Sequence, residues 1–242
     1  MANSMTSVPT ADGGQLPAHL WLPESGSGPG LVLLQEIFGV SDYIRRRAQD
    51  LADLGYVVLA PEIYWRSGDV GPFGWETIER AMTKVTELDW GQAVLDGAAA
   101  VEQLRGNDAV TGGTGVIGFC FGGGLGFAVA AHLEGADGGG RSVDALVSFY
   151  GSALAGLVDT ATVVAPSLHH FGLADQYIAA DLVRRIESVL TQQPATTFCT
   201  YPGADHAFDN SDGPLHHPEA SAQAWGRTVE WLREHLPVHS PA

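Results

Sequence analysis

The chain has few cysteines, few basic residues and no long apolar run, and each of these shortages excludes a class of protein. Two cysteines among 242 residues cannot build a disulfide framework, and their spacing is not that of a metal site. The chain has only 12 basic residues but 28 acidic ones, and the resulting net charge of −16 disfavours nucleic acid and anionic membranes as partners. The apolar runs are far shorter than the ~18 residues that a membrane span needs. We therefore expect no metal, no nucleic acid and no membrane among its partners.

Length and composition are those of an ordinary globular enzyme or binding domain. Hydrophobic residues make up 45% of the chain and charged residues 17%, which is usual for a globular protein. Because 242 residues suit one hydrophobic core, we expect residues 1–242 to form a single α/β domain and to act as a monomer. Residues 1–6 have neither a basic leader nor an apolar segment, so the expected location is the cytoplasm.

One stretch, Val116–Gly124, organises the rest of the sequence. An apolar run typical of a buried strand meets Gly-Phe-Cys-Phe-Gly at 118–122, and an alanine-rich segment typical of a helix follows at 125–133. This is the nucleophile-elbow pattern, with cysteine in the place of serine. The helix would direct its free N–H groups and positive dipole end at Cys120, which favours a thiolate and leaves the N–H of Phe121 free to bind an oxyanion. The simpler interpretation is a glycine-rich turn around a buried cysteine, and the motif alone does not decide between them.

Buried strands alternate with helices along the chain, joined by short connections. This order predicts an α/β-hydrolase fold, a doubly wound and mostly parallel sheet with helices on both faces and its site at the carboxyl ends of the strands. The predicted strands are 19–23 at an edge, 31–34, 56–61, the run before the elbow, 143–151, 166–172 and 196–201. The predicted helices are 41–54, 75–88, 89–105, 125–133, 175–190 and 218–236, with a loop at 65–75.

Two polar residues follow later strands in the order that a hydrolase triad requires. Asp175 comes after the strand at 166–172, and His206 comes after the strand at 196–201. Nucleophile, acid and histidine occur in this order in α/β-hydrolases. We therefore predict a Cys120, Asp175, His206 triad, in which His206 is the base and proton donor and Asp175 holds its tautomer. An aspartate before a helix is often only an N-cap and a loop histidine is often only solvated, so the prediction depends on the three placements together.

Three residues close to this constellation compete for the same roles. They are Asp205, Asp209 and His216. Asp205 adjoins His206, and side chains at adjacent positions would point in different directions. Asp175 is therefore preferred as the acid.

Other polar features receive structural interpretations. His169 and His170 are interpreted as core or sheet-end residues, and Cys199 as a small core residue. The run Arg45–Arg47 is interpreted as a solvated helix face. Gly113–Gly118 matches a dinucleotide fingerprint in its letters, but it lies before and within a strand instead of after one, so no nucleotide cofactor is expected.

Four segments together resemble the dienelactone hydrolase (carboxymethylenebutenolidase) family. They are Gln35–Val40, Gly55–Pro61 with Tyr64–Arg66, Gly118–Gly123 and Gly203–Phe208, and they extend over residues 30–210. The resemblance implies a cofactor-free hydrolase that acts on a small-molecule lactone or ester through the triad named above. It also implies an oxyanion hole made by the N–H groups of Ile37 and Phe121.

The resemblance further implies a role for Glu36, which would contact the resting Cys120 and move when substrate binds. From the residues alone, Glu36 could instead be a carboxylate at the sheet end that forms a salt bridge. The two interpretations differ in the partner that they give to its carboxylate.

The sequence departs from the family where a substrate carboxylate would be held. Members that act on dienelactones are expected to use one arginine in the helical segment after the large loop and one just past the catalytic histidine. Arg80 is the only candidate for the first, and residues 207–210 contain no arginine. Aromatic side chains could line an apolar pocket instead. The predicted pocket residues are Trp65, Phe73, Arg80, Trp90 and Phe208, with Trp75 and Met82 as further candidates.

Other functions stay open at this point. The protein could be a general carboxylesterase, or a scaffold that binds a small ligand without turnover, because a fold does not guarantee a function. A redox role for Cys120 is less favoured, since no resolving cysteine lies near it in the sequence.

Overall fold

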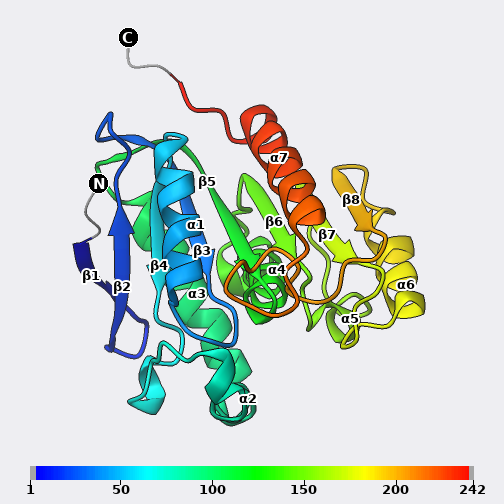
Figure 1. The fold of residues 1–242 in the computed structure, drawn as a ribbon. Coiled ribbons are helices and arrows are strands. Elements are labelled where there is room, and N and C mark those ends of the chain that lie inside the picture. Colours follow the sequence, from blue (N-terminus) through cyan, green and yellow to red (C-terminus); the bar gives the residue numbers. More distant parts are fainter. Residues whose placement is uncertain (1–3, 240–242) are drawn as a thin grey trace.

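The computed structural model describes residues 4–239, and within them the strands form one eight-stranded sheet (Figure 1). The strands are β1 (Ser4–Pro9), β2 (Gln15–Trp21), β3 (Gly28–Leu34), β4 (Val57–Pro61), β5 (Val110–Phe119), β6 (Ala145–Phe149), β7 (Ser167–Gly172) and β8 (Thr196–Tyr201). The helices are α1 (Asp42–Asp53), α2 (Ile78–Glu87), α3 (Trp90–Arg105), α4 (Phe121–Glu134), α5 (Leu154–Leu157), α6 (Ala180–Leu190) and α7 (Pro218–His235), with short 3₁₀ turns η1 (Trp65–Ser67), η2 (Trp75–Thr77) and η3 (Ala136–Gly138).

The sheet has the order β1-β2-β4-β3-β5-β6-β7-β8. Only β1 with β2 and β2 with β4 pair antiparallel, whereas β4 through β8 run parallel. Helices α1 and α7 lie on one face of the sheet, and α3 and α4 lie on the other (Figure 1). The predicted mostly parallel α/β sheet with helices on both faces is therefore confirmed.

The direction of winding changes between β3 and β5, which are neighbours in the sheet. The chain leaves β3 toward β4 on one side and continues from β5 toward β8 on the other. Ligand sites of open α/β sheets lie at such switch points, beyond the carboxyl ends of the strands. Residues 35–38 follow β3 and Cys120 follows β5, so both segments lie at this point.

The N-terminal edge of the sheet differs from the sequence prediction. Strand β1 was not expected, and β2 lies between β1 and β4 instead of at the edge. The side chains of β1 are mostly exposed, so the strand lacks the apolar pattern that marks a buried one. Pro9 and Pro17 weaken the strand signal further, because proline cannot donate to the ladder.

The core explains why the other strands were recognisable. All seven residues of β3 are buried, and β4, β6 and β7 are buried along their whole length. Strands covered by helices on both faces need apolar side chains on both faces and therefore read as unbroken apolar runs. Among residues 4–239, no helix is both long and apolar enough to span a membrane.

Candidate active site

Cys120 occupies a strained turn between β5 and α4. Its backbone has φ 54° and ψ −116°, a conformation that residues other than glycine rarely adopt. The turn is tight, because a Cβ on Gly118 would collide with the carbonyl oxygen of Gly122, and a Cβ on Gly122 would collide with that of Leu34. The two glycines of the motif are thus required by close backbone packing. The turn places the thiol at the carboxyl end of the sheet.

The three residues predicted as a triad lie together. His206 Nε2 is 3.0 Å from Cys120 Sγ, and His206 Nδ1 is 2.8 Å from Asp175 Oδ2. The second oxygen of Asp175 accepts hydrogen bonds of 2.8 Å from the N–H groups of Tyr177 and Ile178. Asp175 is therefore held by the start of the following segment while it orients the imidazole. All three triad side chains belong to buried residues.

The charges around His206 favour its protonated form. Burial alone would disfavour an imidazolium, but Cys120 and Asp175 outweigh it and raise the pKa of His206 well above its ordinary value. The main favourable contribution comes from the sulfur of Cys120. The surroundings of His206 thus favour the imidazolium form of this residue.

Backbone strain among residues 4–239 is concentrated at this site. The non-glycine residues with positive φ are Cys120, Tyr150 and Ala207, at 54°, 38° and 53°. Ala207 follows His206, and the ring of Tyr150 lies 5.2 Å from the His206 ring. Strained backbone outside glycine tends to occur at functional sites, where the surrounding structure maintains it.

Ile37 and Phe121 line the same cavity as Cys120. Phe121 is the first residue of α4, and the first N–H groups of a helix have no acceptor within the helix. The carbonyl of Ile37 accepts a hydrogen bond of 3.1 Å from the Tyr64 hydroxyl, which fixes the orientation of this backbone segment. Both residues therefore border the space beside Cys120, and their role as an oxyanion hole stays a prediction.

Glu36 is buried beside the triad, with partners that the sequence did not indicate. Its Oε2 accepts a hydrogen bond of 2.6 Å from the Asn210 amide, and its Oε1 accepts one of 3.3 Å from the Tyr150 hydroxyl. Among residues 4–239, the carboxylate of Glu36 thus forms no salt bridge. It also forms no hydrogen bond with Cys120, whose sulfur faces His206. The implied contact with the resting thiol is therefore not a hydrogen bond in this structure, and the role of Glu36 stays a prediction. Asn210 lies four residues after His206, so the sequence places it near the site. The sequence does not show that Asn210 binds Glu36.

The environment of Glu36 makes its charge sensitive to pH near neutrality. Burial raises the pKa of Glu36 from 4.5 to about 7, against the opposing effect of the hydrogen bond from Asn210. The folded state therefore binds a proton more tightly than the unfolded state between these pH values, and stability contributed by this group is lost as the pH rises through them.

We expect the substitution Glu36→Gln to stabilise the protein relative to wild type increasingly as the pH rises from 4.5 to 7. One pKa unit corresponds to 1.36 kcal/mol, so the gain across this range should approach about 3 kcal/mol. Urea unfolding of both proteins at several pH values measures the difference. The exposed Glu24→Gln serves as the matched control and should show no comparable pH trend. A Glu36→Gln difference that is independent of pH would contradict the prediction.

The cavity next to Cys120 has a volume of about 210 Å³. It is lined by Glu36, Ile37, Phe38, Trp75, Ile78, Met82, Val85, Cys120, Phe121, Ser152, Tyr177, His206 and Ala207. Trp75 and Met82, the two further candidates from the sequence, are among these residues. The prediction of the pocket lining is wrong for five residues that do not line this cavity: Trp65, Phe73, Arg80, Trp90 and Phe208.

Trp65 and Arg80 point to acidic partners elsewhere. The indole N–H of Trp65 donates a hydrogen bond of 2.8 Å to the buried carboxylate of Asp96. The guanidinium of Arg80 forms an exposed ion pair with Asp69 at 2.7 Å. Both side chains satisfy their polar groups outside the cavity and leave its wall to apolar neighbours.

Phe73, Trp90 and Phe208 are packing residues behind the cavity. Phe73 belongs to a small apolar cluster beneath α2. Trp90 contacts the ring of Phe121 edge-on, with centroids 5.8 Å apart, and Phe208 packs in the same manner on Tyr150 at 5.3 Å. These rings therefore support residues of the site without lining the cavity.

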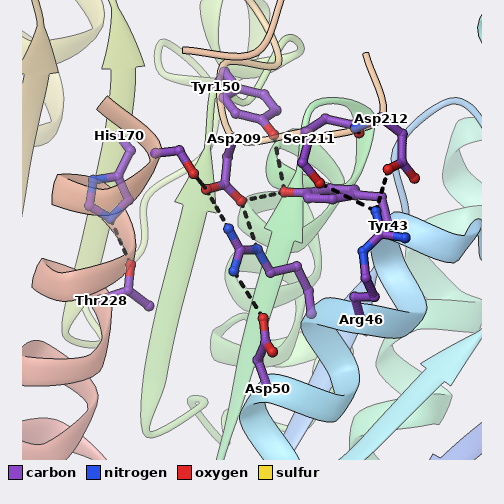
Figure 2. Close-up of polar contacts among 12 residues, drawn as sticks. Tyr43, Arg46, Asp50, Tyr150, His170, Asp209, Ser211, Asp212 and Thr228 are labelled. Atoms are coloured by element: carbon purple, nitrogen blue, oxygen red, sulfur yellow. Dashed lines mark hydrogen bonds and ion pairs between the residues drawn. The ribbon is translucent and has the colours of Figure 1, made fainter. Parts of the chain in front are cut away.

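The loop that carries His206 is anchored to α1 by a buried ion pair (Figure 2). Asp209 accepts hydrogen bonds of 2.6 and 2.8 Å from Arg47, one of 2.5 Å from the Tyr43 hydroxyl and one of 2.7 Å from Ser221. Tyr43 and Tyr150 approach each other at 3.5 Å, which links this cluster to the partner of Glu36. Asp209 is thus a structural anchor and not a competitor for the acid of the triad.

The prediction that Arg45–Arg47 on α1 form a solvated helix face is correct for only one of the three residues. The side chain of Arg47 is 14% exposed, whereas that of Arg46 is 49% exposed and pairs with Asp212 (Figure 2). Arg45 donates to the carbonyl of Val40. Only Arg46 behaves as predicted, because α1 turns the neighbouring positions toward the sheet and the 202–217 loop.

His169, His170 and Asp205 have structural roles. His169 and His170 are fully buried in β7, as predicted, and burial lowers the pKa of each to about 3. His170 is hydrogen-bonded to Thr228 at 3.0 Å (Figure 2). Asp205 accepts the N–H of His206 and the side-chain amide of Gln176, so it braces the loop and does not face the imidazole ring.

Comparison with known proteins agrees with this geometry. The family model described as the dienelactone hydrolase family matches residues 16–236. The chain belongs to the dienelactone hydrolase family. The carboxymethylenebutenolidase of Pseudomonas sp. (strain P51) is 32% identical over 236 residues, covering 96% of this chain and 95% of the relative. Carboxymethylenebutenolidase 1 of Cupriavidus pinatubonensis is 28% identical over 236 residues, covering 96% and 97%.

A solved structure gives the same result for the fold. A candidate dienelactone hydrolase from Klebsiella pneumoniae superposes with a TM-score of 0.80 at 28% identity, covering 96% of this chain and 98% of the other. The family membership expected from the sequence is confirmed, and with it the α/β-hydrolase fold. The protein is a carboxylic ester hydrolase of this family.

Proposed function

We propose that the protein hydrolyses lactones or small carboxylic esters through an acyl-enzyme on Cys120. The observation that carries this proposal is the continuous set of contacts from Cys120 through His206 to Asp175 at the wall of a cavity. The family membership and the carboxymethylenebutenolidases among the relatives support the same chemistry. The cytoplasmic location and the monomeric state remain predictions from the sequence.

In the first half-reaction, the Cys120 thiolate attacks the carbonyl carbon and forms the C–S bond. The displaced electron pair becomes an oxyanion, which the N–H groups of Ile37 and Phe121 bind. Collapse of this intermediate breaks the C–O bond, and the imidazolium of His206 gives its proton to the leaving oxygen. With a lactone, the leaving oxygen stays attached to the acyl group through the opened ring.

The second half-reaction releases the acid. Neutral His206 takes a proton from water, which attacks the thioester carbonyl. The second oxyanion uses the same two N–H groups and collapses with loss of the Cys120 thiolate. Asp175 holds the imidazole in the tautomer that both steps need.

Partitioning between water and hydroxylamine tests the proposal. Esters of one acid with different alcohols should give the same ratio of hydroxamate to free acid, because both products arise from one acyl-Cys120 intermediate. The measurement follows both products by chromatography at fixed hydroxylamine concentration. Cys199→Ala, which alters the half-buried thiol on β8, is the control and should give the same ratio.

Two results would contradict the proposal in different ways. A ratio that changes with the alcohol would indicate direct attack by water, without a common acyl-enzyme. Failure to hydrolyse any ester or lactone would favour the alternative in which the fold only binds a small ligand.

A further inference from the structure

One wall of the cavity is built by a single face of α2. Ile78, Met82 and Val85 are spaced four and three residues apart and all line the cavity. This spacing places them on one side of the helix. Phe38 and Trp75 extend the same apolar wall. A group that occupies this space is therefore surrounded by hydrocarbon and aromatic rings.

The cations of α2 are directed away from the cavity. Arg80 lies two positions after Ile78, which puts it on a different side of the helix, and it pairs with Asp69. Its guanidinium also lies 5.5 Å from the centre of the Phe73 ring. Lys84 is 3.7 Å from Glu87. The described residues that line the cavity include neither lysine nor arginine.

The polar end of the cavity does not supply a cation to a ligand either. His206 is the cationic lining residue, and its ring nitrogens face Cys120 and Asp175. Glu36 contributes a carboxyl group that accepts hydrogen bonds from Asn210 and Tyr150, both of which are neutral. Because burial raises the pKa of Glu36 to about 7, part of this group is anionic at neutral pH. A second carboxylate here would be desolvated and close to like charge.

We propose that the substrate's non-reacting part is uncharged and apolar, so that the enzyme prefers neutral esters and lactones over those that carry a carboxylate. This inference rests on the proposed function, because it names the substrate class of the same site. The α2 face selects by apolar burial, and the lack of an available cation rejects a carboxylate. The net charge of −16 acts in the same direction on the approach of an anion.

Two matched substrate pairs test the preference. The first is mono-p-nitrophenyl adipate and its methyl ester, and the second is carboxymethylenebutenolide and its methyl ester. In each pair the methyl group removes the negative charge and leaves the rest of the molecule unchanged. We expect kcat/KM to be at least about tenfold higher for the neutral member, because burying an unpaired carboxylate is costly. In a series of p-nitrophenyl alkanoates, kcat/KM should rise by up to about fourfold per methylene until the cavity is full.

A pair of variants tests the cause. Met82 lines the cavity and is 47% exposed, so Met82→Arg adds a cation to the wall whose charge can stay hydrated. It should shift the ratio of kcat/KM between the two members of each pair toward the carboxylate. Arg80→Ala removes an outward-facing cation and should leave the wild-type ratio unchanged.

The outcomes separate this inference from the proposed function. Equal or better turnover of the carboxylate forms by the wild-type protein would overturn the inference and leave the hydrolase mechanism intact. A larger effect of Arg80→Ala than of Met82→Arg on the ratio would also overturn it, since the outward cation would then be the one that acts on substrate. Lack of turnover with all four compounds and the alkanoates would instead remove the proposed function, and the inference with it.

Discussion

Replacement of Cys120 by alanine should lower kcat for ester hydrolysis by on the order of 10⁴-fold or more. The reason is that the Cys120 sulfur is the group that His206 Nε2 faces, while Asp175 is hydrogen-bonded to the other ring nitrogen, so the variant loses the proposed nucleophile. The cavity and the two N–H groups proposed as the oxyanion hole remain in the variant, so a small residual rate over water is expected. Steady-state assays with a p-nitrophenyl ester measure the loss, and unfolding by urea checks that the fold persists.

The same variant should change the titration of His206. Because Cys120 makes the largest contribution that raises the pKa of His206, its removal should lower that pKa. NMR of the imidazole protons follows this directly in both proteins. Cys199→Ala is the matched control, and it should affect neither turnover nor the titration. Full activity in Cys120→Ala, or an unchanged His206 titration, would show that the sulfur does not act as proposed.

Loss of the buried Arg47–Asp209 pair should have the largest effect on stability. Arg47→Ala leaves Asp209, which is 1% exposed, without its cation, and removes the guanidinium that stacks 4.1 Å from the Trp225 ring. Breaking a buried ion pair by removing one partner typically costs about 3–5 kcal/mol. The free energy of unfolding from urea titration measures this loss.

Arg46→Ala provides the control on the neighbouring position of α1. Its ion pair with Asp212 is about half exposed on both sides, and such pairs contribute less than about 1 kcal/mol. Similar destabilisation by both substitutions would show that the burial of the Arg47 pair is not what matters. Arg47→Ala should also reduce activity, because Asp209 anchors the loop that carries His206.

Much of the fold and the elbow followed from short-range features of the sequence. Gly118 and Gly122 are needed because each Cβ would meet backbone within a few residues or on the adjoining strand. Strands β3, β6 and β7 were recognisable because each is buried on both faces. Strand β1 was missed because its side chains are mostly exposed. The proximity of Cys120, Asp175 and His206 could be predicted because parallel strands end at one edge of a sheet, so chain order alone brings their following loops together.

Side-chain partners and the cavity wall were decided only in three dimensions. Glu36 and Asn210 are 174 residues apart, and Arg47 and Asp209 are 162 apart, so no local pattern connects them. The pocket prediction failed for a related reason. Successive helix positions differ in direction by about 100°, so the orientation of α2 determines that Met82 enters the cavity and Arg80 does not. The sequence by itself thus determined the family, the fold and the order of the reacting groups, whereas tertiary packing determined what surrounds them, because only packing sets which face of each helix meets the site.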